Sequence, residues 1–185
     1  MKSNGKISRI LSIDGGGIRG IVPAVVLAHL EETLQQLSNN PGARLADFFD
    51  LFAGTSTGSM IVVGLLTPNK DNRPIYSAKE IIDLYFDNAE VIFQGSLLQD
   101  IKSVAGLLNV KYNPEGIESV FRQHFPDAEL KQLLKPTLIP VYDLTRGKNY
   151  FFRQQKAQVS VRHNYYIRDV LRSATSAITY FPPTQ

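Results

Sequence analysis

The sequence predicts an α/β sandwich in which a mainly parallel sheet lies between helices. Two glycine-rich turns, at 14–20 and 54–58, each follow a short apolar run typical of a strand and precede an apolar segment typical of a helix. A strand–helix–strand unit has a right-handed crossover, so the two strands are expected to be parallel neighbours. Because parallel strands end at the same edge of a sheet, both turns are predicted to meet there.

The N-terminal half supplies the elements of this unit. A first strand is predicted around 7–13, and a long helix at 21–37. Pro23 falls in the first turn of that helix, where its missing N–H is tolerated. Apolar residues at helical spacing form one apolar stripe on the helix, made of Val22, Val26, Leu30, Leu34 and Leu37. The apolar run 48–53 predicts the second strand, and an apolar helix follows from Met60.

Further elements follow along the chain. Ser77 and Glu80 form a capping box that opens a helix, and another helix begins at Asn113-Pro114. The segment 93–112 is expected to form either a partly apolar flap over the site or a loosely packed excursion from the core. Strands at 138–142 and 150–152 are expected to form a hairpin, and 166–174 a final helix.

The second glycine-rich turn, Gly54-Thr55-Ser56-Thr57-Gly58, has the G-x-S-x-G pattern of a nucleophile elbow. In such an elbow a tight turn lifts the serine hydroxyl out of the sheet edge. The flanking glycines allow a close backbone approach that a Cβ atom would prevent. The strand before the turn and the helix after it favour Ser56 as a nucleophile over a flexible polar loop.

The first turn, Asp14-Gly15-Gly16-Gly17-Ile18-Arg19-Gly20, presents a row of unobstructed backbone N–H groups. Those of Gly15, Gly16 and Gly17 are predicted to form an oxyanion hole, which the amide of Thr57 joins. The same residues spell the G-x-G-x-x-G of dinucleotide-binding proteins. That motif needs an acidic residue at the end of the second strand, where this chain has Ala53-Gly54. The nucleotide interpretation is therefore rejected. Arg19 either fixes the loop or binds an anionic head group.

Together, the two motifs resemble the patatin-like phospholipase family, which is marked by D-G-G-G-x-R-G, then G-x-S-x-G, then a distant D-G-G or D-G-A. Ser173–Ala177 and Tyr180–Pro183 resemble the stretch that leads to the third motif. The resemblance covers nearly the whole chain. It implies a patatin-like α/β/α sandwich, forming a single domain over 1–185 that is incomplete at its C-terminus. The resemblance also implies that further motif residues support the site, namely Asp14, Arg19, Gly20, Gly54 and Gly58.

The resemblance also implies an activity. Ser56 would work with an aspartate in a Ser–Asp dyad that hydrolyses carboxylic esters of phospholipids or galactolipids through an acyl-enzyme. The implied partner is a lipid at a membrane or micelle surface, without nucleic acid. No metal or organic cofactor is implied, and the oligomeric state stays open.

The aspartate of the third motif is missing, because no Asp-Gly-Gly or Asp-Gly-Ala follows Ser56. Asp143 follows a strand-like run, but its role as a turn former is favoured. The resemblance implies that the catalytic aspartate lies beyond Gln185 and that the 185-residue chain alone is inactive. The three histidines are expected at the surface or rim, namely His29, His124 and His163.

Two alternatives remain beside the lipid acyl hydrolase. One is a soluble carboxylesterase or thioesterase on the same fold. The other is a non-catalytic lipid-binding or regulatory domain that keeps the two loops without turnover. Continuation into a D-G-G or D-G-A strand would favour an enzyme.

The composition is that of a globular domain, with 185 residues of which 43% are hydrophobic. The absence of cysteine excludes disulfides, thiolate metal sites and a cysteine nucleophile. Met1–Lys6 lacks a signal-peptide pattern, and no apolar run has the length of a membrane span, so a cytoplasmic or peripheral protein is expected. The net charge is +3, and basic residues concentrate in the C-terminal third. A solvated face is the favoured interpretation of these residues, and contact with anionic lipid, which the resemblance supports, is the alternative.

Overall fold

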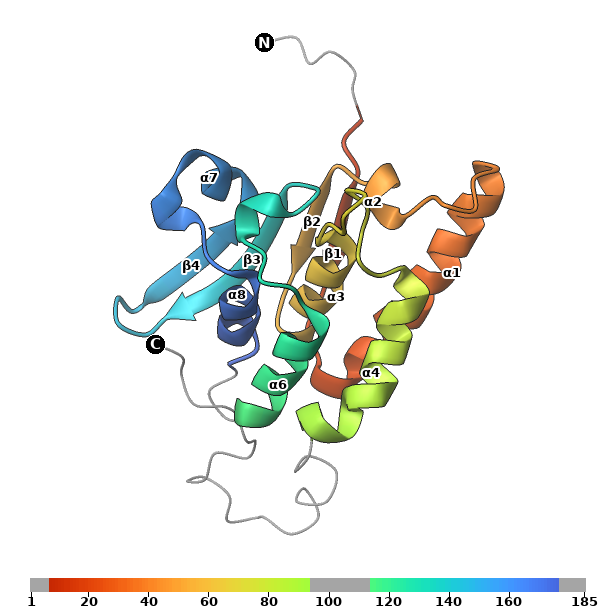
Figure 1. Ribbon diagram of the computed structural model, residues 1–185. Helices are drawn as coiled ribbons and strands as arrows, with labels where there is room; N and C mark the ends of the chain where they lie inside the picture. Colours follow the sequence, from red (N-terminus) through yellow and green to blue (C-terminus); the bar gives the residue numbers. More distant parts are fainter. Residues whose placement is uncertain (1–6, 94–113, 177–185) are drawn as a thin grey trace.

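A computed structural model describes residues 7–93 and 114–176 (Figure 1). Its sheet has the order β1-β2-β3-β4. β1 pairs with β2 and β2 with β3 in parallel, whereas β3 and β4 form an antiparallel hairpin. The strands are β1 (Ile10–Ile13), β2 (Leu51–Gly54), β3 (Thr137–Asp143) and β4 (Lys148–Arg153). The predicted α/β class with a mainly parallel sheet and the predicted hairpin are confirmed.

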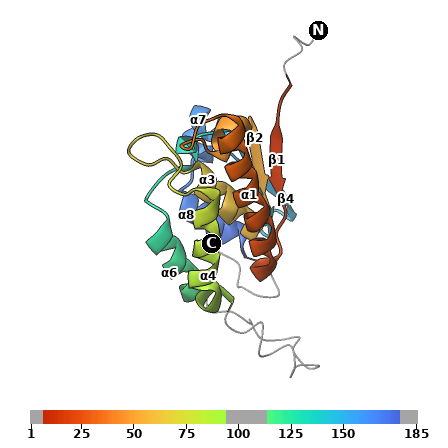
Figure 2. The same cartoon turned by 90° about the vertical axis from the view of Figure 1, so that its right-hand side faces the viewer.

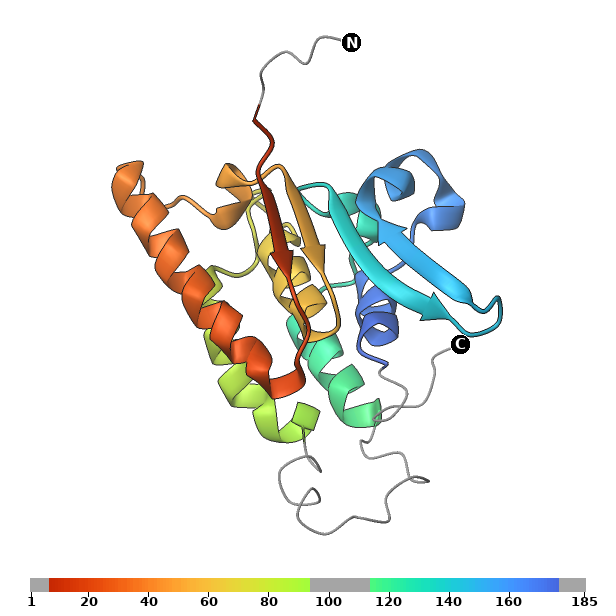
Figure 3. The same ribbon diagram turned by 180° about the vertical axis from the view of Figure 1, so that it is seen from behind.

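The helices pack around this sheet. In Figure 3 the strands face the viewer, with α3 behind β1 and β2 and with α1 alongside β1. Figure 2 shows β1 along one side of the molecule and α4 and α6 along the other. The α-helices are α1 (Ile21–Leu37), α2 (Leu45–Phe48), α3 (Thr57–Leu66), α4 (Ala78–Phe93), α6 (Pro114–His124), α7 (Gln154–Val159) and α8 (Ile167–Ala174). The 3-10 turns are η1 (Gly17–Gly20), η2 (Leu130–Gln132) and η3 (Val161–His163).

The core forms around α3, which is buried along its whole length. Its mostly apolar composition suits this position, because α3 contacts the sheet, α4 and α8 and has no solvent-facing side. Phe52 of β2 is fully buried in the same cluster. None of the helices in the described part of the chain is apolar and long enough to cross a membrane.

Helix α1 has the predicted bounds, and its apolar stripe is only partly buried. It buries Ala24, Leu27 and Glu31, while Val22 and Val26 are exposed. Leu37 is exposed too, whereas Leu30 and Leu34 pack partly on the core. The reason is that α1 packs against α4, which sets its inward face. The apolar stripe therefore lies partly on the helix face that packs on the core and partly on a face that is exposed to solvent.

Other sequence expectations have mixed outcomes. The capping box is confirmed, because the Ser77 amide donates to Glu80 Oε2 at 2.7 Å and the Glu80 amide donates to Ser77 Oγ at 3.3 Å. Among the basic residues of the C-terminal third, Arg172 departs from the expected solvated face, since it is buried and donates to Glu118. The predicted flap at 93–112 and the stretch Tyr180–Pro183 lie outside the described residues.

A buried carboxylate joins three helices. Glu31 of α1 accepts a hydrogen bond from the Leu45 amide at the start of α2 and another from the Ala78 amide at the start of α4, each at 3.0 Å. Helix N-termini carry unsatisfied N–H groups and partial positive charge, so a carboxylate stabilises both. Glu31 thereby fixes where α2 and α4 begin relative to α1.

We expect Glu31→Gln to lower the free energy of unfolding by about 1–3 kcal/mol, because a glutamine oxygen can accept one of these bonds while its NH₂ group faces the other donor. Glu32→Gln, on the exposed face of the same helix, is the matched control. Urea unfolding followed by circular dichroism measures both. Equal midpoints for the two variants would contradict the bridging role.

Candidate active site

Ser56 occupies the strained turn that the G-x-S-x-G pattern predicts. It lies between β2 and α3 with φ 52° and ψ −126°, in a positive-φ region that non-glycine residues rarely adopt. The turn is closed by the Gly58 amide, which donates to the Thr55 carbonyl at 2.9 Å. The Ser59 amide donates to the Ser56 carbonyl at 2.9 Å, and the Ser59 hydroxyl donates to the same oxygen. The half-buried Ser56 is thus held at the N-terminus of the buried helix α3.

The two glycine-rich turns touch at points where a side chain would not fit. A Cβ on Gly58 would stand 2.3 Å from the Ile13 carbonyl oxygen. A Cβ on Gly15 would stand 2.7 Å from Ser56 Cβ. The register that pairs Ile13 with Gly54 brings the ends of β1 and β2 together and so makes this contact possible. The predicted meeting of the two turns at one sheet edge is present.

The glycine loop after β1 is tied to the elbow by one hydrogen bond. The Gly16 amide donates to Thr57 Oγ1 at 3.3 Å. Gly17 has a φ of 59°, which suits glycine, and opens the 3-10 turn η1. Within this turn the Arg19 amide donates to the Gly16 carbonyl at 3.2 Å, and the Arg19 side chain is exposed. The oxyanion role of Gly15, Gly16, Gly17 and Thr57 stays a prediction.

The side chain of Tyr85 in α4 packs against both glycine-rich turns. Its buried hydroxyl donates to the Thr57 carbonyl at 3.1 Å, in the first turn of α3. A Cβ on Gly20 would stand 2.4 Å from that hydroxyl, so Gly20 leaves room for the tyrosine. Burial raises the pKa of Tyr85 to about 12. The amphipathic pattern of 78–93 marks Tyr85 as a core residue, but the sequence carries no signal for the carbonyl that its hydroxyl binds.

Gly54 packs against the elbow from the strand side. A Cβ there would stand 2.6 Å from the Gly58 carbonyl oxygen and 2.8 Å from Ser59 Cα. Close packing therefore requires glycine at both flanking positions of the G-x-S-x-G motif. Asp14, at the start of the glycine loop, is exposed.

Within the described residues, no side chain forms a hydrogen bond with the Ser56 hydroxyl. Asp143 instead accepts from the Arg146 amide at 3.0 Å, and that bond is the main cause of its lowered pKa. Asp143 thus acts as the turn former that the sequence favoured. The described residues contain no cluster of acidic or histidine side chains that could hold a metal ion.

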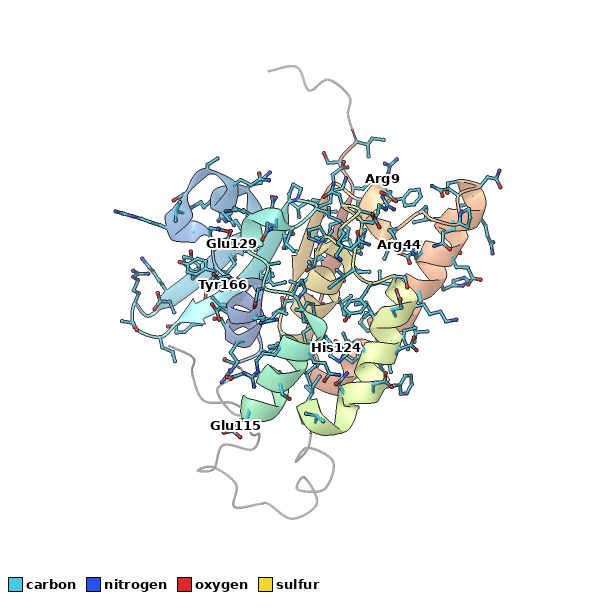
Figure 4. All side chains as sticks on the ribbon, in the orientation of Figure 1. Arg9, Arg44, Glu115, His124, Glu129 and Tyr166 are labelled. Carbon is cyan, nitrogen blue, oxygen red and sulfur yellow. The ribbon has the colours of Figure 1, made fainter. Side chains whose placement is uncertain are left out.

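The histidines serve other contacts. Figure 4 shows His124 between α6 and α4. Its Nε2 accepts from the Asn88 side-chain amide at 3.1 Å, and its Nδ1 lies 3.2 Å from the Tyr76 hydroxyl. Burial lowers the pKa of His124. His163 Nδ1 lies 3.1 Å from the Tyr150 hydroxyl, and His29 is exposed on α1.

Comparisons with known proteins agree with the motifs. The family model for patatin-like phospholipase matches residues 11–185. The chain is 37% identical over 97% of its length to Patatin-like protein 4 of Arabidopsis thaliana, and 37% identical over 97% to Patatin-17 of Solanum cardiophyllum. It is 36% identical over 97% to a protein of Solanum tuberosum named Probable inactive patatin-3-Kuras 1. The match covers 45%, 44% and 46% of these relatives, so the chain spans about half their length.

We expect Gly58→Ala to lower the free energy of unfolding by about 3 kcal/mol, because the added methyl group meets the backbone of β1 rather than a movable side chain. Gly42→Ala is the control, since its Cβ would meet a side-chain oxygen at 3.4 Å. Thermal unfolding measures both variants. A Gly58→Ala variant as stable as Gly42→Ala would show that the two turns need not touch.

Tyr85→Phe should cost about 1 kcal/mol at neutral pH, because the Thr57 carbonyl loses its donor. The folded state holds the Tyr85 proton up to a pKa of about 12 and the unfolded state loses it near 10. The contribution of protonated Tyr85 to the free energy of unfolding is therefore fully present below pH 10. It is lost as the pH rises toward 12, by at most about 1.4 kcal/mol per pH unit.

The Tyr85→Phe variant should therefore show a shallower alkaline decline than the unmodified chain. Tyr142→Phe, which removes an exposed hydroxyl, is the control. Urea titrations across the alkaline range provide the comparison. Parallel declines for Tyr85→Phe and the unmodified chain would rule out a buried proton at Tyr85.

Proposed function

Because the chain belongs to the patatin-like phospholipase family, we propose that it carries the nucleophile half of a lipid acyl hydrolase site. One observation carries the proposal. Ser56 stands in a positive-φ elbow that packs directly on a glycine loop at the shared edge of two parallel strands. Strain of this kind persists where the surroundings enforce it, and it is typical of catalytic positions. Such an elbow presents a serine hydroxyl toward a bound ester.

In the proposed reaction, Ser56 Oγ attacks the ester carbonyl carbon while its proton passes to an aspartate carboxylate. The tetrahedral oxyanion is stabilised by backbone amides of the glycine loop and by the N-terminus of α3. The carbonyl re-forms, and the alcohol leaves with the proton from the aspartic acid. Water then attacks the acyl-enzyme and gives a proton to the aspartate. That proton returns to Ser56 Oγ as the fatty acid departs.

We assign the aspartate to a D-G-G or D-G-A motif outside these 185 residues. This assignment agrees with a Ser56 hydroxyl that forms no hydrogen bond with a described side chain, and with an Asp143 that is engaged by Arg146. It leads us to expect that the 185-residue chain hydrolyses no ester by itself. Glycerophospholipids or galactolipids, met at a membrane or micelle surface, are the proposed substrates.

A non-catalytic lipid-binding domain is the second candidate. It is favoured by the same lack of a described hydrogen-bond partner for the Ser56 hydroxyl, and a relative of comparable similarity bears a name that includes the words probable inactive. The two candidates differ in turnover, which an exchange experiment measures directly.

The test replaces the matching segment of Patatin-17 with this chain and assays phospholipid vesicles beside a soluble butyrate ester. We expect the exchanged protein to hydrolyse the vesicle lipid and the 185-residue chain alone to be silent. Ser56→Ala in the exchanged protein should lower turnover at least about a thousandfold, because the covalent step is lost. Ser38→Ala, an exposed serine at the end of α1, is the control.

Three results would contradict the proposal. Equal rates for the Ser56→Ala and unmodified exchanged proteins would remove Ser56 from the mechanism. Activity toward the soluble ester alone would indicate a soluble esterase. A folded but silent exchanged protein would indicate the non-catalytic domain.

A further inference from the structure

The turn of the β3–β4 hairpin lies at the sheet edge that carries the candidate active site. β3 pairs with β2 through Thr137 and Leu138, and its later residues pair with β4. Because β1, β2 and β3 run parallel, the hairpin turn at 144–147 follows β3 at the same edge as the two glycine-rich turns. In Figure 3 the arrows of these three strands point toward this edge, and the hairpin turn stands at an outer corner of the molecule.

Three large apolar side chains are exposed on the hairpin. Tyr142 is 55% exposed, Leu144 51% and Phe151 38%. Ile139 and Phe152 belong to the core, and successive side chains of a strand point to opposite faces. Tyr142 and Phe151 therefore share the face that points away from the core, where they are diagonal neighbours on the two strands. Folding leaves both rings and the Leu144 side chain in contact with water.

Basic side chains surround these apolar groups. The hairpin carries three exposed cations, Arg146, Lys148 and Arg153, and one carboxylate, Asp143. Asp143 accepts from the Arg146 amide and pairs with its guanidinium at 3.2 Å, which closes the turn. The Arg153 guanidinium stands 5.6 Å from the centre of the Phe151 ring. The three cations and the three apolar side chains together form one exposed area, the hairpin surface.

We propose that the hairpin surface docks on an anionic lipid membrane, with its cations at the head groups and with Leu144 and the two rings in the interface. Basic side chains are attracted to anionic lipid, and aromatic rings are favoured where water meets hydrocarbon. Charge alone would suit an acidic protein or a nucleic acid as well. The exposed leucine among the cations favours lipid, because hydrocarbon removes it from water. Reversible membrane binding of this kind combines two weak signals, charge and apolar insertion.

Docking through the hairpin surface would bring the elbow to the lipid. Ala53 of β2 pairs with Leu138 of β3, and from this pair the two strands run on toward Ser56 and Asp143. Adjacent strands lie about 4.8 Å apart, so the elbow and the hairpin are neighbours along one edge. That an ester is cleaved there rests on the proposed function. The docking itself requires no chemistry at Ser56.

The two components of binding respond differently to salt. Each cation close to an anionic surface tightens binding about fivefold, and added salt screens this attraction. Burial of one leucine side chain tightens binding about tenfold, and salt does not screen this contribution. A purely electrostatic contact would lose no affinity when Leu144 is replaced.

The test is co-sedimentation of the 185-residue chain with vesicles of diether phosphatidylcholine, with or without diether phosphatidylserine. Ether lipids have no ester to cleave, so the assay measures binding alone. We expect binding to the anionic vesicles and little to the neutral ones. Arg146→Gln combined with Lys148→Gln should weaken binding about twentyfold. Lys70→Gln combined with Lys79→Gln removes the same charge at exposed positions outside the hairpin and is the control.

Leu144→Ser tests the apolar component. It should weaken binding about tenfold, at low and at high salt. Val159→Ser is the matched control, because Val159 is an 85% exposed aliphatic residue at the end of α7. Circular dichroism checks that each variant is folded. The Asp143 bond to the Arg146 backbone amide is available in the charge variant, so the turn keeps this bond.

Three results would overturn the proposal. The first is equal vesicle binding by the two charge variants. The second is a Leu144→Ser variant that binds as tightly as Val159→Ser, which would indicate an electrostatic surface for an acidic protein or a nucleic acid. The third is equal binding to neutral and anionic vesicles.

Binding and turnover can fail separately. Anionic vesicles that bind the chain through the hairpin surface, with a silent exchanged protein, would retain the docking surface and reject the hydrolase. Hydrolysis by the exchanged protein, with vesicle binding insensitive to the hairpin variants, would retain the hydrolase and reject the docking surface.

Discussion

The candidate site depends on a close contact between two turns in which a glycine, without a Cβ atom, lies on one side of each approach. Gly58 lies against the carbonyl oxygen of Ile13, and Gly15 lies against Ser56. Parallel pairing of β1 and β2 brings the two turns to one edge, but the distance between them is set by the missing Cβ atoms. The nucleophile and its expected amide donors are therefore positioned by main chain, which leaves little freedom for them to drift apart.

The helix layer transmits support to this contact through two polar side chains. Glu31 of α1 binds the first amide of α4, and Tyr85 of α4 binds the Thr57 carbonyl beneath the elbow. Each bond contributes about 1 kcal/mol by itself. The two bonds act in series. The start of α4 sets the position of Tyr85, and Tyr85 in turn fixes the first turn of α3. A change at Glu31 is thus expected to act on Ser56 through packed helices.

Local patterns predicted the elements well and the packing less well. The helix 21–37, the capping box at Ser77 and the hairpin after 138 follow from spacing and turn chemistry that act over a few residues. The inward face of α1 depends on α4, more than forty residues away, so the spacing alone could not show that Val22 and Val26 of the apolar stripe are exposed. The targets of Glu31 and Tyr85 are likewise set by tertiary contacts. The motif predicted the strained turn at Ser56 because the elbow is a local structure, and the role of Ser56 as nucleophile stays a prediction.

The bond between the Gly16 amide and Thr57 Oγ1 bears on how the glycine loop would meet a substrate. At 3.3 Å it is a long hydrogen bond between neutral groups. An oxyanion would be a stronger acceptor, because charge-assisted bonds are shorter and roughly twice as strong. We therefore expect Thr57 to hold the loop in register when the site is empty and to release the Gly16 amide when negative charge develops. The threonine hydroxyl would then be free to rotate and donate to the same oxygen, so that one side chain serves both states.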